Sequence, residues 1–555
     1  MSFANARTSR PLLLGSRHMV SSGHPLASHA ALMVLEAGGN AVDAGVAAGF
    51  ALNVVQPDMA NLGGVAPVMI HRADLGCITS IAGIGQWPAL ATLEAVKASG
   101  NGRIPAGPGR WVVPGAPDAW LKSLELYGTI SVADALAPAI DLARGGFPVD
   151  YFLANNLRQA APRWEGWSNA DIYLPSGTAP EEGHLLRQPA LAETLERLVA
   201  AATAAGGSRQ RAVRAARECF YRGEIAEIAG RFSKEAGGFL RASDMAAFEA
   251  AEEPVLSVSY AGRRFYGCGP WSQGPALLQM LKMAQRYDLA ALQEAEFHHV
   301  LIGIAERALS DRNRHYGDPR FIDVDMDRLL SDAHAAERTA GLAADRPSPD
   351  GETSPRDGMR SPDTTYVCVV DAQGNAFSAT PSDSTIMVTP MVPGLGFGLS
   401  DRGLQASLDA ADPNCVAPGK RPRLTPNPGL MIGPDGLMAY GTPGGEVQSQ
   451  AMLQFLMAHL HRGIDLQAAV EEPRWASYAV PATEDPHPAQ PGVVHVEQPL
   501  SDRIAPRLRE LGHDAKPWPQ RAALAGGICA IGRDMASGVL SGAADPRRLS
   551  YAMGR

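Results

Sequence analysis

Apolar residues recur at helical spacing over several long stretches of the chain, and Gly-rich breaks separate these stretches. Residues 40–54, NAVDAGVAAGFALNV, are a clear case, and the side chain of Asn40 is suited to cap the first turn. The small residues of this stretch predict a helix that packs closely against a sheet. A further break is expected near Gly145-Gly146. The spacing predicts helices over 27–36, 40–54, 117–144, 146–160, 190–230, 274–314, 447–462 and 498–512.

Short apolar runs bounded by turn residues predict strands. Residues 256–268 alternate in character, and Ala261-Gly262 supplies the turn of a hairpin. Residues 364–370 predict a buried strand, 371–375 a turn and 376–380 the returning strand. Residues 60–71 predict a Gly-rich turn leading into a strand, and further strands are expected over 429–433, 437–441, 493–497, 526–532 and 537–541. The overall pattern places helices outside and mixed strands inside.

A polar segment interrupts this pattern immediately before the strand that begins at Thr364. Residues 345–362, DRPSPDGETSPRDGMRSP, are rich in Pro, Gly and Ser and contain few apolar side chains. Such a composition is typical of a solvated linker. The chain therefore passes directly from a linker into a strand of the core.

Composition narrows the class of protein. The chain has 555 residues, of which 45% are hydrophobic and 19% are charged, which is an ordinary balance for a soluble globular protein. A chain of this length could form two to four domains, or a single large unit built of several layers. The formal net charge is −9 and no long basic run is present, which argues against a nucleic-acid partner.

Six scattered cysteines include no C-x-x-C pair, so the sequence gives no support for a zinc site of that type. A reducing compartment fits this usage better than a disulfide-rich one, without excluding disulfides. The first twenty residues lack the apolar stretch of a signal peptide, and no apolar segment is long enough to span a membrane. We therefore expect a cytoplasmic protein with no membrane partner.

Eight segments, taken together and in order, resemble the gamma-glutamyltransferase family of N-terminal-nucleophile hydrolases. Among them, residues 363–380 read DTTYVCVVDAQGNAFSAT and residues 441–446 read GTPGGE. Any one segment is weak evidence for the family, but the occurrence of all eight in the family's order over nearly the whole chain is specific evidence. The segments are 38–57, 113–120, 127–149, 308–321, 363–380, 417–423, 441–446 and 544–548.

The resemblance implies an α+β fold, a four-layer αββα sandwich with two stacked sheets. It also implies a precursor that is cut between Asp363 and Thr364 into a large piece, 1–363, and a small piece, 364–555. The two pieces would be partners in one intertwined unit rather than separate domains. No metal and no organic cofactor are implied.

The chemistry of an N-terminal threonine explains why the cut falls there. A threonine hydroxyl is a poor nucleophile until a base removes its proton. Once Thr364 is a chain terminus, its own amine, with an unperturbed pKa of about 8, supplies that base. The hydroxyl of Thr364 can also attack the carbonyl of Asp363 in the precursor. No convincing serine–histidine triad offers an alternative nucleophile.

Two further elements of the site follow from the resemblance. The backbone N–H groups of Gly444 and Gly445 would stabilise an oxyanion. Glycines also favour a tight turn after a strand, and both roles can hold together. Ser382 occupies a position where the family often has a second threonine near the nucleophile. Its hydroxyl would form a hydrogen bond with Thr364. The alternative, that Ser382 is an ordinary serine in a turn, has equal weight.

The sequence departs from glutamyl-specific members of the family at several positions, of which an arginine and an acidic residue bind the substrate head in those members. Those members have, in order, an arginine, an acidic residue, a pair of serines, an asparagine and a histidine. The matching positions here hold Ile84, Gln405, Leu424 with Thr425, Ser384 and Tyr366. A zwitterionic head left unpaired in such a pocket would cost several kcal/mol.

Retained chemistry with a changed acyl group is the simplest interpretation of these departures. We expect a small-molecule amide substrate, either an acid amide such as oxamate or an acyl amide, with hydrolysis and acyl transfer both open. An oxamate-like acid needs a cation, and Arg402, Arg423 or Lys420 are candidates, although basic residues are usually solvated. A genuine gamma-glutamyltransferase or glutathione hydrolase is the alternative enzyme. An uncleaved, inactive binding or scaffold protein is the alternative of another class.

Overall fold

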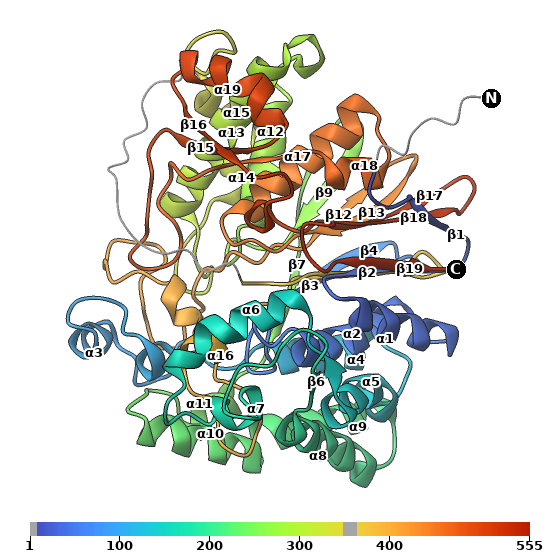
Figure 1. Cartoon of the computed structure of the whole chain (residues 1–555), viewed down its shortest axis with the longest axis vertical. Helices are drawn as coiled ribbons and strands as arrows, with labels where there is room; N and C mark the ends of the chain where they lie inside the picture. Colours follow the sequence, from blue (N-terminus) through green and yellow to red (C-terminus); the bar gives the residue numbers. More distant parts are fainter. Residues whose placement is uncertain (1–7, 348–362) are drawn as a thin grey trace.

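Two seven-stranded antiparallel sheets lie face to face at the centre of the molecule (Figure 1). The computed structural model describes residues 8–347 and 363–555. The first sheet has the order β1 (Leu13–Gly15), β18 (Leu540–Ala544), β17 (Cys529–Asp534), β13 (Gly436–Gly441), β12 (Gly429–Ile432), β9 (Arg263–Gly267), β8 (Leu256–Tyr260). The second has the order β19 (Tyr551–Gly554), β2 (Met19–Ser22), β10 (Val367–Val370), β11 (Ala376–Ala379), β3 (Ala66–Arg72), β4 (Cys77–Gly83), β7 (Ala251–Pro254).

Helices cover the outer face of each sheet, which gives four layers. An apolar cluster between the sheets includes Met69 and Val370 from the second sheet and Leu437 and Ile531 from the first. The helices on the second sheet include α1 (Pro25–Glu36), α2 (Ala41–Val55), α4 (Ala116–Tyr127), α5 (Val132–Gly145), α8 (Pro189–Ala205) and α9 (Arg209–Tyr221). Those on the first include α12 (Gly274–Ala284), α13 (Glu294–His315), α17 (Val447–Arg462), α18 (Leu466–Glu471) and α19 (Leu500–Glu510). The expected αββα sandwich is confirmed.

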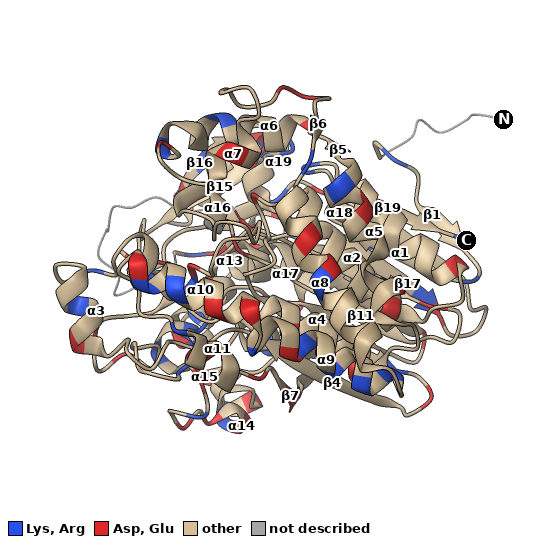
Figure 2. Ribbon diagram, turned by 90° about the horizontal axis from the view of Figure 1, so that it is seen from below, with Lys and Arg blue, Asp and Glu red and all other residues tan. Residues whose placement is uncertain are grey.

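Smaller elements surround these layers. They are α3 (Leu93–Ser99), α6 (Tyr151–Ala160), α7 (Asn169–Tyr173), α10 (Glu224–Glu235), α11 (Ala242–Ala247), α14 (Met326–Leu329), α15 (Asp332–Thr339), α16 (Thr385–Val388), the pair β5 (Phe147–Pro148) and β6 (Leu185–Leu186), and the sheet β14 (Trp475–Ser477), β15 (Val493–Glu497), β16 (Asp514–Trp518). Acidic and basic residues both occur along the outer helices α8 and α10 (Figure 2).

Helix α2 shows how the sequence positions the sheet that carries the site. Asn40 accepts from the amide of Asp43, whose carboxylate accepts from the amide of Asn40, so the predicted cap is a full capping box. A side-chain carbon on Gly45 would lie 2.2 Å from the ring of Phe377 on β11. Glycine at this position therefore lets α2 lie directly on the central strands of the second sheet.

Glycine breaks shorten several predicted helices. The stretch 190–230 is three helices, because Gly206-Gly207 ends α8 and Gly223 precedes α10. Gly128 similarly separates α4 from α5, and the helix expected from residue 146 begins only at Tyr151. Most of the predicted linker, 348–362, lies outside the described residues.

The hairpin around the turn 371–375 is confirmed, and it joins distant parts of the chain. Strand β10 pairs with β11 on one side and with the N-terminal strand β2 on the other. Each large sheet therefore contains strands from both sides of residue 363. A cut at that residue would leave two pieces that share both sheets.

Candidate active site

Thr364 lies three residues before β10, in a backbone conformation that a strand does not have. Its φ is +90°, which is unusual for a β-branched residue and costs about 1–3 kcal/mol. Its amide donates to the carbonyl oxygen of Met59 at 3.1 Å, and its side chain is buried. The predicted strand consequently begins at Val367 rather than at Thr364. The backbone strain is thus located at Thr364, immediately after the bond that is expected to be cut.

The hydroxyl of Thr364 lies in a short chain of hydrogen bonds. Its Oγ1 atom is 2.7 Å from the Oγ atom of Ser382 and donates to Oδ1 of Asp363 at 3.1 Å. Ser382 is held by paired backbone bonds with Val65, of 2.9 and 3.0 Å. The Ser382 hydroxyl can donate to Thr364 Oγ1, and it also lies 3.5 Å from Oδ1 of Asp363.

Arg402 completes this chain from the opposite side. Its Nη2 atom donates to Ser382 Oγ at 2.8 Å and forms an ion pair with Asp363. Burial alone would lower the pKa of the guanidinium, but Asp363, Asp383 and Asp401 together raise it above its ordinary value. Arg402 is therefore charged and fixes the orientation of the Ser382 hydroxyl.

Ser384 contributes a second contact to the same carboxylate. Its hydroxyl donates to Oδ2 of Asp363 at 3.3 Å. Four residues proposed from the sequence, Thr364, Ser382, Ser384 and Arg402, therefore meet around Asp363. The structure brings these five residues together.

Gly444 and Gly445 form the turn between β13 and α17. Their φ values are +127° and +55°, which favour glycine. The carbonyl of Gly445 accepts from Gln273 Nε2 at 2.8 Å, and that of Gly444 accepts from the amide of Val447 at 3.0 Å. Neither glycine amide donates to an acceptor within the described part of the chain. The pair thus offers two N–H groups to a ligand.

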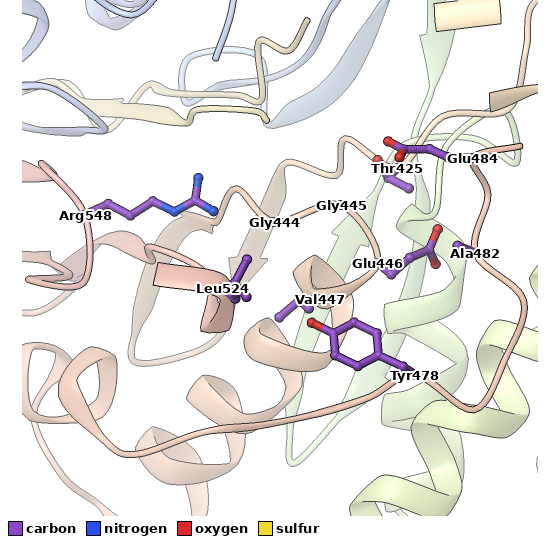
Figure 3. Close-up of a pocket in the computed structure, with 10 residues that line it drawn as sticks. All are labelled: Thr425, Gly444, Gly445, Glu446, Val447, Tyr478, Ala482, Glu484, Leu524 and Arg548. Atoms are coloured by element: carbon purple, nitrogen blue, oxygen red, sulfur yellow. The ribbon is translucent and has the colours of Figure 1, made fainter. Parts of the chain in front are cut away.

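A pocket adjoins this turn (Figure 3). Gln405 lies at its edge, because its Nε2 atom approaches Thr425 Oγ1 at 3.4 Å and Glu484 Oε1 at 3.3 Å. The lining residues are Thr425, Gly444, Gly445, Glu446, Val447, Tyr478, Ala482, Glu484, Leu524 and Arg548. The Gly pair, Thr425 and Gln405 therefore form a second group of the residues expected from the sequence.

The remaining candidates lie elsewhere. Ile84 and Leu424 belong to the apolar cluster between the sheets. Arg423 is buried and donates to the carbonyl of Arg312 at 2.8 Å, and Lys420 donates to the carbonyl of Pro413 at 2.8 Å. These two cations are engaged with backbone oxygens rather than with Thr364.

Sequence reasoning missed Arg548 and Glu484, both of which line the pocket. Arg548 lies within the segment 544–548 that contributed to the resemblance, so its position was flagged but its role was not. Glu484 lies in a loop with no motif of its own. Only the folded arrangement brings either residue to the Gly pair.

No group of three or more His, Cys, Asp or Glu side chains in the described ranges is placed to hold a metal ion. None of the helices in these ranges has both the length and the apolar character that crossing a membrane requires.

Comparison with known proteins decides the family. The family model for gamma-glutamyltranspeptidase matches residues 27–555. The chain belongs to this family. The oxamate amidohydrolase proenzyme of Klebsiella pneumoniae is 32% identical over 554 residues, which cover 97% of this chain and 98% of the relative. The glutathione hydrolase-like YwrD proenzyme of Bacillus subtilis is 31% identical, with 98% and 99% covered.

A solved structure agrees with these matches. The crystal structure of cephalosporin acylase from Bacillus halodurans is 29% identical and superposes with a TM-score of 0.87, covering 100% of this chain and 99% of that chain. This member of the gamma-glutamyltranspeptidase family is therefore an enzyme with the N-terminal-nucleophile hydrolase fold, and its relatives are hydrolase proenzymes. The relatives differ in the amides that their names specify.

Proposed function

We propose that this family member cuts its own chain before Thr364 and then hydrolyses a non-glutamyl amide with the freed residue. The observation that carries the proposal is the 2.7 Å contact between Thr364 Oγ1 and Ser382 Oγ, oriented by Arg402. It joins a nucleophile, a partner hydroxyl and a cation in one buried place.

Self-cleavage needs a base before the terminal amine exists, and Asp363 supplies it. Its Oδ1 atom already accepts the Thr364 hydroxyl proton at 3.1 Å. Oγ1 then bonds to the carbonyl carbon of Asp363, the C–N bond breaks, and the nitrogen of Thr364 takes up a proton. Water hydrolyses the resulting ester and leaves Asp363 with a terminal carboxylate. Breaking this peptide also removes the strain of a φ of +90°, since that dihedral no longer exists.

In the cut enzyme, the amine of Thr364 replaces Asp363 as the base. Oγ1 attacks the substrate carbonyl while its proton passes to the amine, and the N–H groups of Gly444 and Gly445 receive the oxyanion. Collapse of this intermediate breaks the amide bond, and the leaving amine takes the proton. Water then hydrolyses the ester on Thr364 and releases the acid.

The amide is proposed to be non-glutamyl because the substrate-head positions have changed. Ile84 is buried between the sheets, and Gln405 has a neutral side chain where glutamyl-specific members have an acid. The names of two relatives, oxamate amidohydrolase and cephalosporin acylase, support a small acid amide or an acyl amide.

Parallel assays test the substrate class. Purified, cut protein should release ammonia from oxamate or another short acid amide and should turn over a chromogenic gamma-glutamyl anilide poorly. Robust turnover of the anilide would instead indicate a genuine gamma-glutamyltransferase. Thr364→Ala serves as the inactive control in both assays.

A further inference from the structure

Arg548 is a buried cation whose outer end faces the pocket beside the Gly pair. It is 8% exposed, and Figure 3 shows its guanidinium directed toward the Gly444 turn. Its Nε atom donates to the carbonyl of Ala523 at 3.1 Å, and Nη1 lies 3.9 Å from the sulfur of Met59. Its Nη2 atom is buried without a hydrogen-bond partner.

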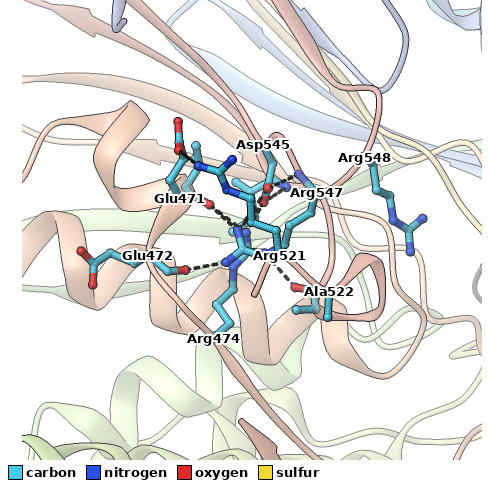
Figure 4. Close-up of polar contacts among 12 residues, drawn as sticks. Glu471, Glu472, Arg474, Arg521, Ala522, Asp545, Arg547 and Arg548 are labelled. Atoms are coloured by element: carbon cyan, nitrogen blue, oxygen red, sulfur yellow. Dashed lines mark hydrogen bonds and ion pairs between the residues drawn. The ribbon is translucent and has the colours of Figure 1, made fainter. Parts of the chain in front are cut away.

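The neighbouring residue, Arg547, shows what a structural arginine looks like in the same segment. Its guanidinium donates to Glu497 at 2.6 and 2.9 Å and to Asp545 at 3.1 Å, and it also bonds two backbone carbonyls. Arg474 pairs with Asp545 from the other side. Figure 4 shows this network with Arg548 standing apart from it. Within the described ranges, no carboxylate lies within 4.0 Å of the Arg548 guanidinium nitrogens.

A buried guanidinium that no carboxylate contacts is unfavourable, and Asp545, Asp363 and Asp58 act on Arg548 only from beyond ion-pair distance. Burial lowers the pKa of Arg548 to about 10, which leaves the group charged at neutral pH. The ion pairs of Arg547 and Asp545 fix the segment that carries it, so the side chain is held at the pocket. An anion that enters the pocket would supply the missing partner.

Arg548 and the Gly pair line the same pocket, and the neighbouring residues Gly526 and Gly527 lie between them. A side-chain carbon on Gly444 would lie 3.7 Å from Gly526 Cα, and one on Gly527 would lie 3.1 Å from Arg548 Cδ. If the scissile carbonyl oxygen rests on the Gly pair, a group bound to Arg548 belongs to the same small acyl unit.

The other candidate cations are less suited to this role. Arg402 already contacts acidic groups, since it pairs with Asp363 and its Nε atom lies 3.9 Å from Asp383. Arg423 and Lys420 donate to the backbone carbonyls of Arg312 and Pro413.

We propose that Arg548 is a specificity-determining residue that binds a carboxylate on the acyl side of the substrate, so that the substrate class is the monoamide of a short dicarboxylic acid. This inference deepens the proposed function and rests on Thr364 and the Gly pair acting as described. It assigns the acid-binding cation to a residue outside the nucleophile's own hydrogen-bond chain.

Oxamate and its uncharged counterpart oxamide provide the test. In cut Arg548→Gln protein, the ratio of kcat/KM for oxamate to that for oxamide should fall about 10- to 100-fold through KM, the range expected when a charge-assisted hydrogen bond is lost. Arg548→Lys should recover part of the ratio. Thermal melting of Arg548→Gln should be unchanged or raised, whereas Arg547→Gln should melt earlier because it breaks a buried network. An unchanged ratio, or an equal loss for both amides, would overturn the assignment.

Calorimetric titration with oxalate separates this inference from the proposed function. Cut wild-type protein should bind oxalate, and Arg548→Gln should bind it at least about 10-fold more weakly. If the protein is cut yet hydrolyses neither amide, the proposed substrate class fails, while the titration still decides the role of Arg548. Equal oxalate affinity in both proteins would overturn that role.

Discussion

Thr364 and Ser382 face each other across a hairpin, with 2.7 Å between Oγ1 and Oγ. The strand register, in which Val367 pairs with Ala379, continues past the ends of the strands until it reaches these two residues. The amide of Thr365 donates to the carbonyl of Pro381 at 3.0 Å and keeps the two chains together there. The hairpin thus fixes the partner of the nucleophile.

Removing the Ser382 hydroxyl should slow both self-cleavage and turnover. A buried polar group that loses its partner costs about 1–3 kcal/mol, or roughly 10- to 100-fold in rate. Ser382→Ala should show this loss and Ser382→Thr should recover much of it, measured by precursor decay and by amide hydrolysis. Ser378→Ala, which removes a buried hydroxyl bonded to Tyr366, is the matched control and should cleave normally. Normal cleavage by Ser382→Ala would refute the role given to this hydroxyl.

Asp363→Asn should separate self-cleavage from catalysis. The amide cannot take the Thr364 proton, so precursor decay should slow by about 100-fold or more. Each molecule that does become cut should hydrolyse substrate at the wild-type rate, because Asp363 is not the base of the mature enzyme. Quantitative gels and burst-corrected assays measure the two rates. Precursor decay as fast as in the wild type would show that another base acts.

Alanine substitutions in the glycine turn should have unequal effects. Gly444→Ala forces a side chain to a φ of +127° and should cost about 10²- to 10³-fold in kcat by displacing an oxyanion donor. At Gly445 a side-chain carbon meets no atom within 4 Å, so Gly445→Ala should lose only about 1–2 kcal/mol of stability from its φ of +55°. Gly463→Ala, with a similar φ of +63° at the end of α17, should lose as much stability without losing activity. Equal activity losses at Gly444 and Gly463 would argue against the oxyanion role.

Asp58 should stabilise the uncut chain at low pH and should lose this contribution as pH rises from about 4 to 7. Burial raises the pKa of this carboxyl to about 7, although Asn156 donates to it at 2.7 Å. Over that interval the folded chain keeps a proton that the unfolded chain has lost, so rising pH favours unfolding. Asp58→Asn, made with Thr364→Ala, should therefore melt higher than its parent at pH 8 and similarly at pH 4. Asp74 is exposed, so Asp74→Asn should show no such pH-dependent gain in melting temperature. If Asp58→Asn also showed no gain at pH 8, the raised pKa assigned to Asp58 would be contradicted.

Local sequence signals predicted the elements that carry the nucleophile. The apolar run after Thr364, the turn at 371–375 and the cap at Asn40 depend on neighbouring residues, and each appears in the structure. Helix ends were predicted less well, because breaks such as Gly206-Gly207 and Gly223 interrupt an otherwise continuous helical pattern.

The pocket depends on contacts that no local pattern contains. Arg548 reaches the Gly444 turn only because β18 and β19 belong to different sheets and the segment between them crosses the gap. The pairing of Arg402 with Asp363 likewise joins positions 39 residues apart. Resemblance located the Gly pair, whereas the charge partners around it required the fold.

The central claim is that Thr364 cuts the chain and then becomes its N-terminal nucleophile. Purified wild-type and Thr364→Ala proteins, compared by denaturing gel with mass spectrometry of the fragments, test it most directly. We predict that the wild type yields two pieces, residues 1–363 and a piece whose first residue is Thr364, while Thr364→Ala stays whole and hydrolyses nothing. A single full-length wild-type chain that is nevertheless active, or a cut at another bond, would contradict the account.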